Sequence, residues 1–156
     1  MKHDFRHWRG GAAGIWTALA VAGLGIGLIA VSSATAARQP VRVQHVALVV
    51  KSDSEHARKG PDGKWHDALL PASFKVRAGE QVVVTVYNYD SGPHSFAVPG
   101  LHINTILMGG SATAPHKTTF TFTAHKRGVY AWHCDPKCDP WAMKHDGFMR
   151  GKITVA

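Results

Sequence analysis

The sequence contains no internal repeat, and beyond residue 37 no stretch has the apolar spacing of a convincing helix. These absences exclude a solenoid and a helical bundle. Cysteine is scarce: the 156 residues include two, and no Cys-x-x-Cys pair occurs. Beyond residue 37 no two histidines stand four residues apart. We therefore expect most of the histidines to be solvated or hydrogen-bonded rather than metal ligands.

Acidic residues are also few. The chain has 10 Asp and Glu against 18 Lys and Arg, which gives a formal net charge of +8 at pH 7. A basic domain can associate with an acidic redox partner or with anionic lipid headgroups, and such association weakens as the salt concentration rises. No nucleic acid is expected as a partner, because the N-terminus has the pattern of an export signal.

The first 37 residues are predicted to be an export signal or a membrane anchor. Lysine and arginine residues precede an uncharged run over residues 10–37, of which residues 15–31 are the most apolar. The run is longer than a usual signal core and close to the roughly 20 residues that span a bilayer. We favour an uncleaved anchor, with its basic end inside the cell, over cleavage after Ala36. Residues 38–156 then form one domain on the extracytoplasmic, periplasmic face.

Beyond residue 37, polar and apolar residues alternate in short runs between turn signals, as in half-buried β-strands. We expect strands over residues 41–50, 73–77, 81–88, 94–98, 103–107, 117–123, 128–134 and 151–155. Residues 51–71 are polar and contain Gly-Pro and Asp-Gly turn signals, which predicts a surface loop. Residues 135–148 are expected to hold at most a helical turn. Seven or eight short strands without a helix predict an all-β sandwich or barrel.

One segment, residues 128–149, gathers both cysteines with two histidines and two methionines. Thiolate, imidazole and thioether groups are donors that copper accepts, whereas methionine is not a usual zinc ligand. In a strand that ends at Cys134, Tyr130 and Trp132 lie on the same face as the cysteine, and His133 lies on the other face. The sequence therefore predicts a soft-metal site in the loop that follows this strand.

Two stretches resemble the copper-binding domain of cytochrome c oxidase subunit II. Residues 88–101, with the sequence NYDSGPHSFAVPGL, are similar to the segment that carries the first copper-ligating histidine of that family. Residues 128–149 are similar to its copper loop, and His94 precedes Cys134 by 40 residues, a separation like that in the family. The resemblance covers residues 74–155. It implies a cupredoxin-like Greek-key β-sandwich or barrel for residues 38–156.

The resemblance also implies a ligand set for one or two copper ions. It makes His94 and His145 imidazole ligands, Cys134 and Cys138 thiolate ligands, and Met149 a weak thioether ligand. In the family, the two cysteines bridge two coppers in a binuclear centre called CuA. The present loop is longer, since six residues separate Cys138 from His145 and three separate His145 from Met149.

Two other interpretations of the loop stay open. The Gly-x-Tyr-x-aromatic-x-Cys run at residues 128–134 resembles small blue copper proteins such as plastocyanin, in which one cysteine and two histidines hold a single copper. Cys134 would then be the ligand and Cys138 would be spare. A Cys134–Cys138 disulfide is the second alternative, because exported proteins are oxidised, but it would leave His145 and Met149 without a role.

Three functions are compatible with this sequence. We favour a membrane-tethered electron carrier that exchanges one electron with a redox partner such as a cytochrome and is not an enzyme on its own. The alternatives are an electron-entry component of a terminal oxidase, as in subunit II, and a periplasmic copper chaperone or sequestration protein. A ligand set fixed on a β scaffold is better suited to holding copper than to releasing it.

Overall fold

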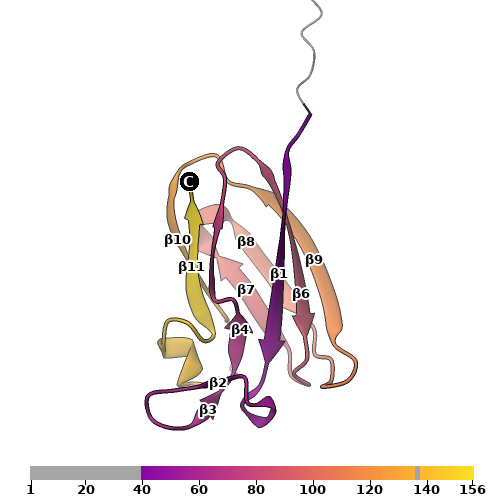
Figure 1. Ribbon diagram of the computed structural model, residues 1–156, viewed down its shortest axis with the longest axis vertical. Helices are drawn as coiled ribbons and strands as arrows, with labels where there is room; N and C mark the ends of the chain where they lie inside the picture. The colour runs from indigo at the N-terminus through magenta and orange to yellow at the C-terminus, as the bar shows by residue number, and fades with distance from the viewer. Residues whose placement is uncertain (1–39, 136–137) are drawn as a thin grey trace, which may run out of the picture. The chain divides into compact units, whose positions relative to one another are not determined.

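The strands of the domain form two β-sheets packed as a sandwich, seen in Figure 1. The computed structural model describes residues 40–135 and 138–156. The first sheet has the strand order β4 (Ala68–Leu70), β1 (Val43–Lys51), β6 (Gln81–Asn88) and β9 (His116–Thr123). The second has the order β5 (Ser73–Val76), β11 (Arg150–Val155), β10 (Gly128–His133), β7 (His94–Val98) and β8 (Ile103–Leu107). The all-β prediction is confirmed.

The remaining regular structure is short. A hairpin joins β2 (Arg58–Lys59) to β3 (Trp65–His66), and 3-10 turns occur at Asp53–Glu55, Pro99–Leu101 and Ala142–Lys144. No α-helix occurs within residues 40–135 and 138–156. The predicted signal or anchor, residues 1–37, lies outside the described residues. In the part of the chain that the structure describes, no helix is long and apolar enough to cross a membrane.

The sandwich is held by the alternation of side chains along its strands. In β6, Val82, Val84 and Val86 are fully buried, while the residues between them are half-buried. Asn88 continues the same inward register and is also buried. Period-two burial of this kind is what places one face of a strand in the core. It also brings a polar side chain, Asn88, to the end of that core.

Aromatic rings from both sheets meet at the centre of the core. Phe96 of β7 stacks on Trp132 of β10 at 5.1 Å between ring centroids, and packs on Phe120 of β9 at 5.6 Å. The indole Nε1–H of Trp132 donates a buried hydrogen bond of 2.7 Å to the carbonyl of Ala72. Gly151 lies between them, where a side chain would collide with that carbonyl. This packing fixes the strand that leads to Cys134.

The prediction of a surface loop over residues 51–71 is wrong at its C-terminal end. Ala68 and Leu69 of β4 are fully buried, and β4 pairs antiparallel with β1. His66, immediately before them, is also buried. Strand β4 could not be predicted, because its three residues, between a polar segment and Pro71, are too few to show a periodic pattern. It brings residues 62–67 against the loop that carries Cys138.

Candidate metal centre

Three segments of the second sheet converge at one end of the sandwich. Because β10 runs antiparallel to β7 and β11, the end of β10 meets the beginnings of the other two strands. Cys134 follows β10, His94 begins β7 and Met149 precedes β11. The backbone N–H of Cys134 donates to the carbonyl of Met149 at 3.1 Å. Sheet topology therefore assembles residues that are far apart in the sequence.

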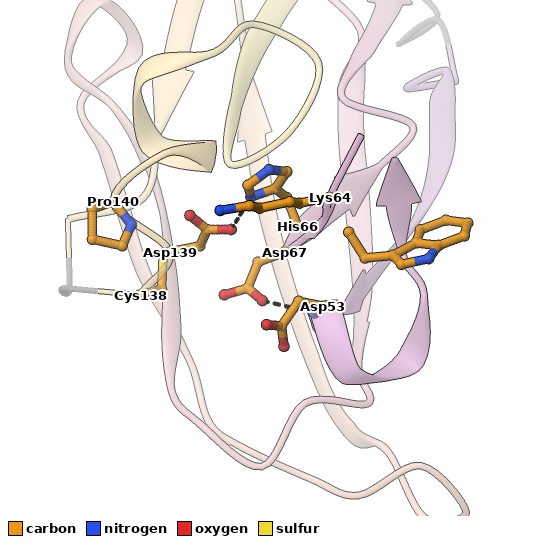
Figure 2. A pocket seen from close by; sticks show the side chains of 8 residues that line it. Asp53, Lys64, His66, Asp67, Cys138, Asp139 and Pro140 are labelled. Atoms are coloured by element: carbon orange, nitrogen blue, oxygen red, sulfur yellow. Dashed lines mark hydrogen bonds and ion pairs between the residues drawn. The ribbon is translucent and has the colours of Figure 1, made fainter. Parts of the chain in front are cut away.

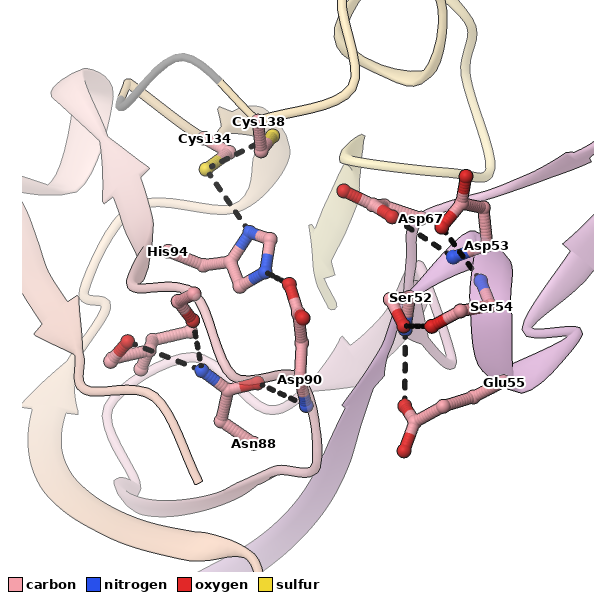
Figure 3. A network of polar contacts seen from close by, with 12 residues as sticks. Ser52, Asp53, Ser54, Glu55, Asp67, Asn88, Asp90, His94, Cys134 and Cys138 are labelled. Carbon is pink, nitrogen blue, oxygen red and sulfur yellow. Dashed lines mark hydrogen bonds and ion pairs between the residues drawn. The ribbon is translucent and has the colours of Figure 1, made fainter. Parts of the chain in front are cut away.

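The two thiols and one imidazole form a compact group of possible ligands. The Sγ atoms of Cys134 and Cys138 are 3.7 Å apart, and Nδ1 of His94 is 3.8 Å from Cys134 Sγ. All three ligand atoms lie within 4.8 Å of one another. Figure 3 shows the imidazole pointing from β7 toward the sulfurs. His94 and Cys134 are buried and Cys138 is half-buried, so the group faces the interior at one side and the surface at the other.

Hydrogen bonds orient the members of this group. The backbone N–H of Ser95 donates to Cys134 Sγ at 3.3 Å, and the hydroxyl of Ser95 accepts the N–H of Asp135 at 2.8 Å. On the other side of the imidazole, Nε2 of His94 is 2.7 Å from Oδ2 of Asp90. A carboxylate accepts the Nε2 proton, which leaves Nδ1 as the nitrogen that faces the sulfurs.

The same contacts shift the pKa values of the two thiols in opposite directions. The hydrogen bond from the Cys138 thiol, together with those from His94 and Ser95, outweighs burial and lowers the pKa of Cys134 to about 5. The pKa of Cys138 is raised, because its thiol donates to that sulfur and would have to ionise beside a thiolate while partly buried. The lowered pKa of Cys134 favours its thiolate, which is the form that binds metals.

The pKa of His94 is raised. Burial lowers it, but the hydrogen bonds to Cys134 and Asp90 act more strongly in the other direction. A positive charge on the ring is thus stabilised from both sides. A metal cation at Nδ1 would occupy the same favourable potential.

His145 lies elsewhere. Its side chain is exposed and stacks on Trp141 at 3.6 Å between ring centroids, and its Nδ1–H donates to the Trp141 carbonyl at 2.7 Å. Among the described residues, the groups of closely spaced ligand atoms do not include His145. Met149 is fully buried beside Cys134. The structure thus brings together His94, Cys134, Cys138 and the backbone of Met149, and the complete five-residue ligand set stays a prediction.

The loop that carries Cys138 is held by contacts that the sequence did not indicate. Oδ1 of Asp139 accepts the backbone N–H groups of Trp141 and Ala142, at 2.8 and 3.0 Å, and Oδ2 lies 2.6 Å from Nδ1 of His66. The Trp141 ring stacks on His66 at 3.9 Å as well as on His145. Residues 75 positions apart therefore form one packed unit beside the thiols.

A surface pocket of about 420 Å³ opens beside this unit, as Figure 2 shows. Cys138 lines it together with the carboxylates of Asp53, Asp67 and Asp139 and the ammonium group of Lys64. Asp67 also belongs to a second group, in which one carboxylate oxygen each of Asp67 and Asp90 and a ring nitrogen of His94 lie within 4.8 Å of one another. The half-buried sulfur is thus reached from solvent through a largely acidic pocket.

The donor set fits copper. Two sulfurs and an imidazole nitrogen at these separations could bind one soft cation, because thiolates suit Cu(I) and imidazole suits both oxidation states. The surroundings of Cys134 favour its thiolate. The other ring nitrogen of His94, Nε2, is held by a carboxylate, as is usual for metal-ligating histidines. The residues present are therefore chemically compatible with the copper that the sequence predicts.

Comparison with known proteins identifies the family of the domain. The model of the cupredoxin-like domain family matches residues 20–155. The chain belongs to the cupredoxin-like domain family. The cupredoxin-like classification agrees with the two-sheet sandwich, and it does not by itself distinguish a CuA-type member from other members. No curated protein matches the chain.

Solved structures similar to this cupredoxin-like domain include copper proteins. One is the metal-binding domain of the Cu(I)-exporting P-type ATPase CopA of Streptococcus pneumoniae D39, crystallised with Cu(I), at 12% identity and a TM-score of 0.48, covering 73% of this chain and 86% of that one. Another is the multicopper oxidase mgLAC, at 17% identity and a TM-score of 0.52. That match covers 73% of the present chain but only 39% of the oxidase chain, and it shows the fold alone.

Proposed function

We propose that this protein is an extracytoplasmic copper-binding electron carrier, whose site uses Cys134, Cys138 and His94 and is completed by Met149 and His145. The observation that carries the proposal is the convergence of two sulfurs and a buried imidazole nitrogen within 4.8 Å at one end of a cupredoxin-like sandwich. Membership of the cupredoxin-like domain family supports it. The number of copper ions, one or two, depends on whether both sulfurs bridge.

Each residue has a defined task in this proposal. Copper, when bound, would supply a one-electron redox couple that no side chain of the domain offers. Cys134 provides a preformed thiolate, and the Ser95 N–H holds that sulfur in place. Burial of His94 and Cys134 excludes water and limits ligand rearrangement, which favours rapid electron exchange. Cys138, half-buried in the pocket wall, would lie close to a partner that docks at this pocket.

The surface beside the site suggests the charge of that partner. Although the chain has an excess of basic residues, the described residues that line the pocket at Cys138 include three acidic side chains, Asp53, Asp67 and Asp139, and two basic ones, Lys64 and His66. A redox protein such as a cytochrome would therefore dock here through a basic face. The acidic partner expected from net charge alone would have to bind elsewhere on the domain, because local charge near the contact governs steering. The N-terminal segment would tether the carrier to the membrane.

The position of His145 favours a second candidate function. With this ring stacked on Trp141, the described group offers two sulfurs and one imidazole nitrogen. Such a soft, three-donor set suits Cu(I) and the binding and delivery of copper rather than redox cycling. A copper-handling protein is thus the alternative, and it differs from the carrier in whether His145 reaches the metal.

The decisive experiment is to load the full-length protein with copper under reducing conditions, desalt it and measure copper per chain, followed by absorption and EPR spectra after oxidation. We expect retained copper and a thiolate-to-copper absorption band. Cys134→Ser should abolish both. His133→Ala is the matched control, because this neighbouring histidine is directed to Asp135 on the opposite face of the strand and should leave both unchanged.

The outcomes separate the candidates. A protein that retains no copper refutes the proposal. Copper that is held only as Cu(I), gives no coloured oxidised form and is lost to a mild chelator establishes the copper-handling function instead. Copper that cycles reversibly and resists the chelator supports the electron carrier.

A further inference from the structure

The buried imidazole of His94 is held by a carboxylate on the side of the ring that faces away from the two sulfurs. Its Nε2 lies 2.7 Å from Oδ2 of Asp90, while its side chain is 1% exposed. A carboxylate only accepts hydrogen bonds, so Nε2 must carry the proton in this contact. We propose that Asp90 is the positioning residue of the copper site: it holds the proton on Nε2, keeps the ring orientation that presents Nδ1 to the two sulfurs, and tunes the bound copper by its charge. This inference rests on the copper site proposed above.

The backbone around Asp90 is built to hold that carboxylate in one place. Asn88, buried at the end of β6, accepts the N–H of Asp90 on its Oδ1 at 3.0 Å. Its Nδ2 donates to the carbonyls of Gly92 and Met108, both at 3.0 Å. The carbonyl of Asp90 accepts the N–H of Gly110 at 2.8 Å. Figure 3 shows this network beside the imidazole. The turn is thus fixed by the Asn88 side chain and by a backbone hydrogen bond, neither of which involves the Asp90 side chain.

Without the carboxylate, two properties of the His94 ring are no longer fixed: the position of its proton and its orientation. The ring could place its proton on either nitrogen, and it could rotate by half a turn so that Nε2 faces the sulfurs. Only one of the four resulting combinations presents an unprotonated Nδ1 to Cys134. Orienting contacts of this kind make metal ligands more basic and better placed, and their loss typically weakens metal affinity about 10- to 100-fold.

A second carboxylate strengthens the electrostatic part of the effect. An oxygen of Asp67 lies within 4.8 Å of both the Asp90 carboxylate and the His94 ring, and Asp67 is 8% exposed. Negative charge in a largely buried site stabilises the more highly charged state of a bound ion. Asp90 should therefore stabilise Cu(II) relative to Cu(I) and lower the reduction potential.

The test compares Asp90→Ala with Asp53→Ala in the full-length protein. Asp53 is a matched control, because its carboxylate lines the neighbouring pocket beside Cys138 and accepts a hydrogen bond from the backbone N–H of Ser54 rather than from His94. Cu(I) affinity is measured by competition with a colorimetric chelator, and ¹⁵N NMR of the diamagnetic Cu(I) form identifies the ring nitrogen that binds. We expect Asp90→Ala to weaken Cu(I) binding about 10- to 100-fold and to lose exclusive binding through Nδ1. Asp53→Ala should retain wild-type affinity and Nδ1 binding.

Asp90→Asn preserves side-chain size and isolates the charge, and it also serves if the alanine variant does not fold. Voltammetry of the Asn variant should show a potential shifted to a more positive value than that of the wild type. If the Asp90 variants that fold bind copper through Nδ1 with wild-type affinity and potential, the positioning role is refuted while the copper site stands. Equal losses in Asp53→Ala would refute it too, because the effect would then be one of net charge. A wild-type chain that binds no copper refutes both proposals.

Discussion

Asp139 should stabilise the domain far more than its place in a surface loop suggests. Its carboxylate makes three hydrogen bonds: two from the backbone N–H groups that begin the turn after it, and one with the buried ring of His66. Asp139→Ala removes all three. It leaves Nδ1 of His66, a residue that is 6% exposed, without its carboxylate partner.

The expected loss in the free energy of unfolding follows from these contacts. Loss of a side chain that accepts the first N–H groups of a helical turn costs about 1 kcal/mol. Loss of a hydrogen bond to a charged group costs about 1.5–3 kcal/mol. Since Asp139 is 16% exposed and water can replace part of these bonds, we expect the free energy of unfolding to fall by about 2–4 kcal/mol.

Urea denaturation of the metal-free protein measures this quantity. The matched control is Asp146→Ala, in the same loop, whose carboxylate is 53% exposed and pairs with Arg150 and Lys152. Exposed ion pairs contribute little, so this control should change the free energy of unfolding by less than about 0.5–1 kcal/mol. Equal losses in the two variants, or a loss below about 0.5 kcal/mol in Asp139→Ala, would refute the reasoning.

The effect of Asp139 should also depend on pH. Burial lowers the pKa of His66, but its hydrogen bonds to Asp139 and Asp62 outweigh burial and raise it above 6.5. A group whose folded-state pKa is raised adds stability that is fully present below its unfolded pKa and disappears as the pH rises through the folded value. Asp139→Ala should therefore lose more stability at about pH 5.5 than at about pH 9. An equal loss at both values would show that His66 is neutral throughout.

Three further predictions concern the site and the core. Cys138→Ser should abolish two-copper binding and the delocalised spectrum if both sulfurs bridge two ions, and a variant that stays blue with one copper per chain would exclude the binuclear assignment. Residues 38–156 produced alone should fold and, when loaded with copper under reducing conditions, retain the metal after desalting; complete loss of copper would refute the predicted copper site. Trp132→Phe should lower the free energy of unfolding by about 1–3 kcal/mol in urea denaturation, because it removes the buried indole hydrogen bond to the Ala72 carbonyl and part of a fully buried ring; an unchanged midpoint would contradict this role.

Much of the fold could be predicted because period-two alternation is strong in the long strands. Residues 81–88 were predicted as a strand with the same bounds that β6 has in the structure. The burial of Trp132 and Cys134 on one face of β10 followed from the same alternation. Short strands carry too few residues for such a pattern, which is why β4 was missed.

The site was predictable only in part, because spacing along the chain does not report how a loop turns. The meeting of His94 with Cys134 was indicated by a family resemblance and follows from antiparallel pairing. The contacts of Asp139 with His66, and of Trp141 with His145, arise from side-chain packing that no local pattern encodes. The sequence contains one signal for Asp90, namely that it is an acidic residue four positions before the predicted ligand His94. That spacing alone does not show that the two side chains meet, because their contact depends on the turn that Asn88 holds.

The order of the strands has a consequence for when the domain can fold during synthesis. Strand β11 lies between β5 and β10, so the second sheet stays divided until residues 150–155 have been synthesised and can pair. Pairing across such long sequence separations is also slow. The domain therefore cannot complete its folding before β11 has left the ribosome, and a stop codon just before Arg150 would remove the strand that joins β5 to the rest of this sheet.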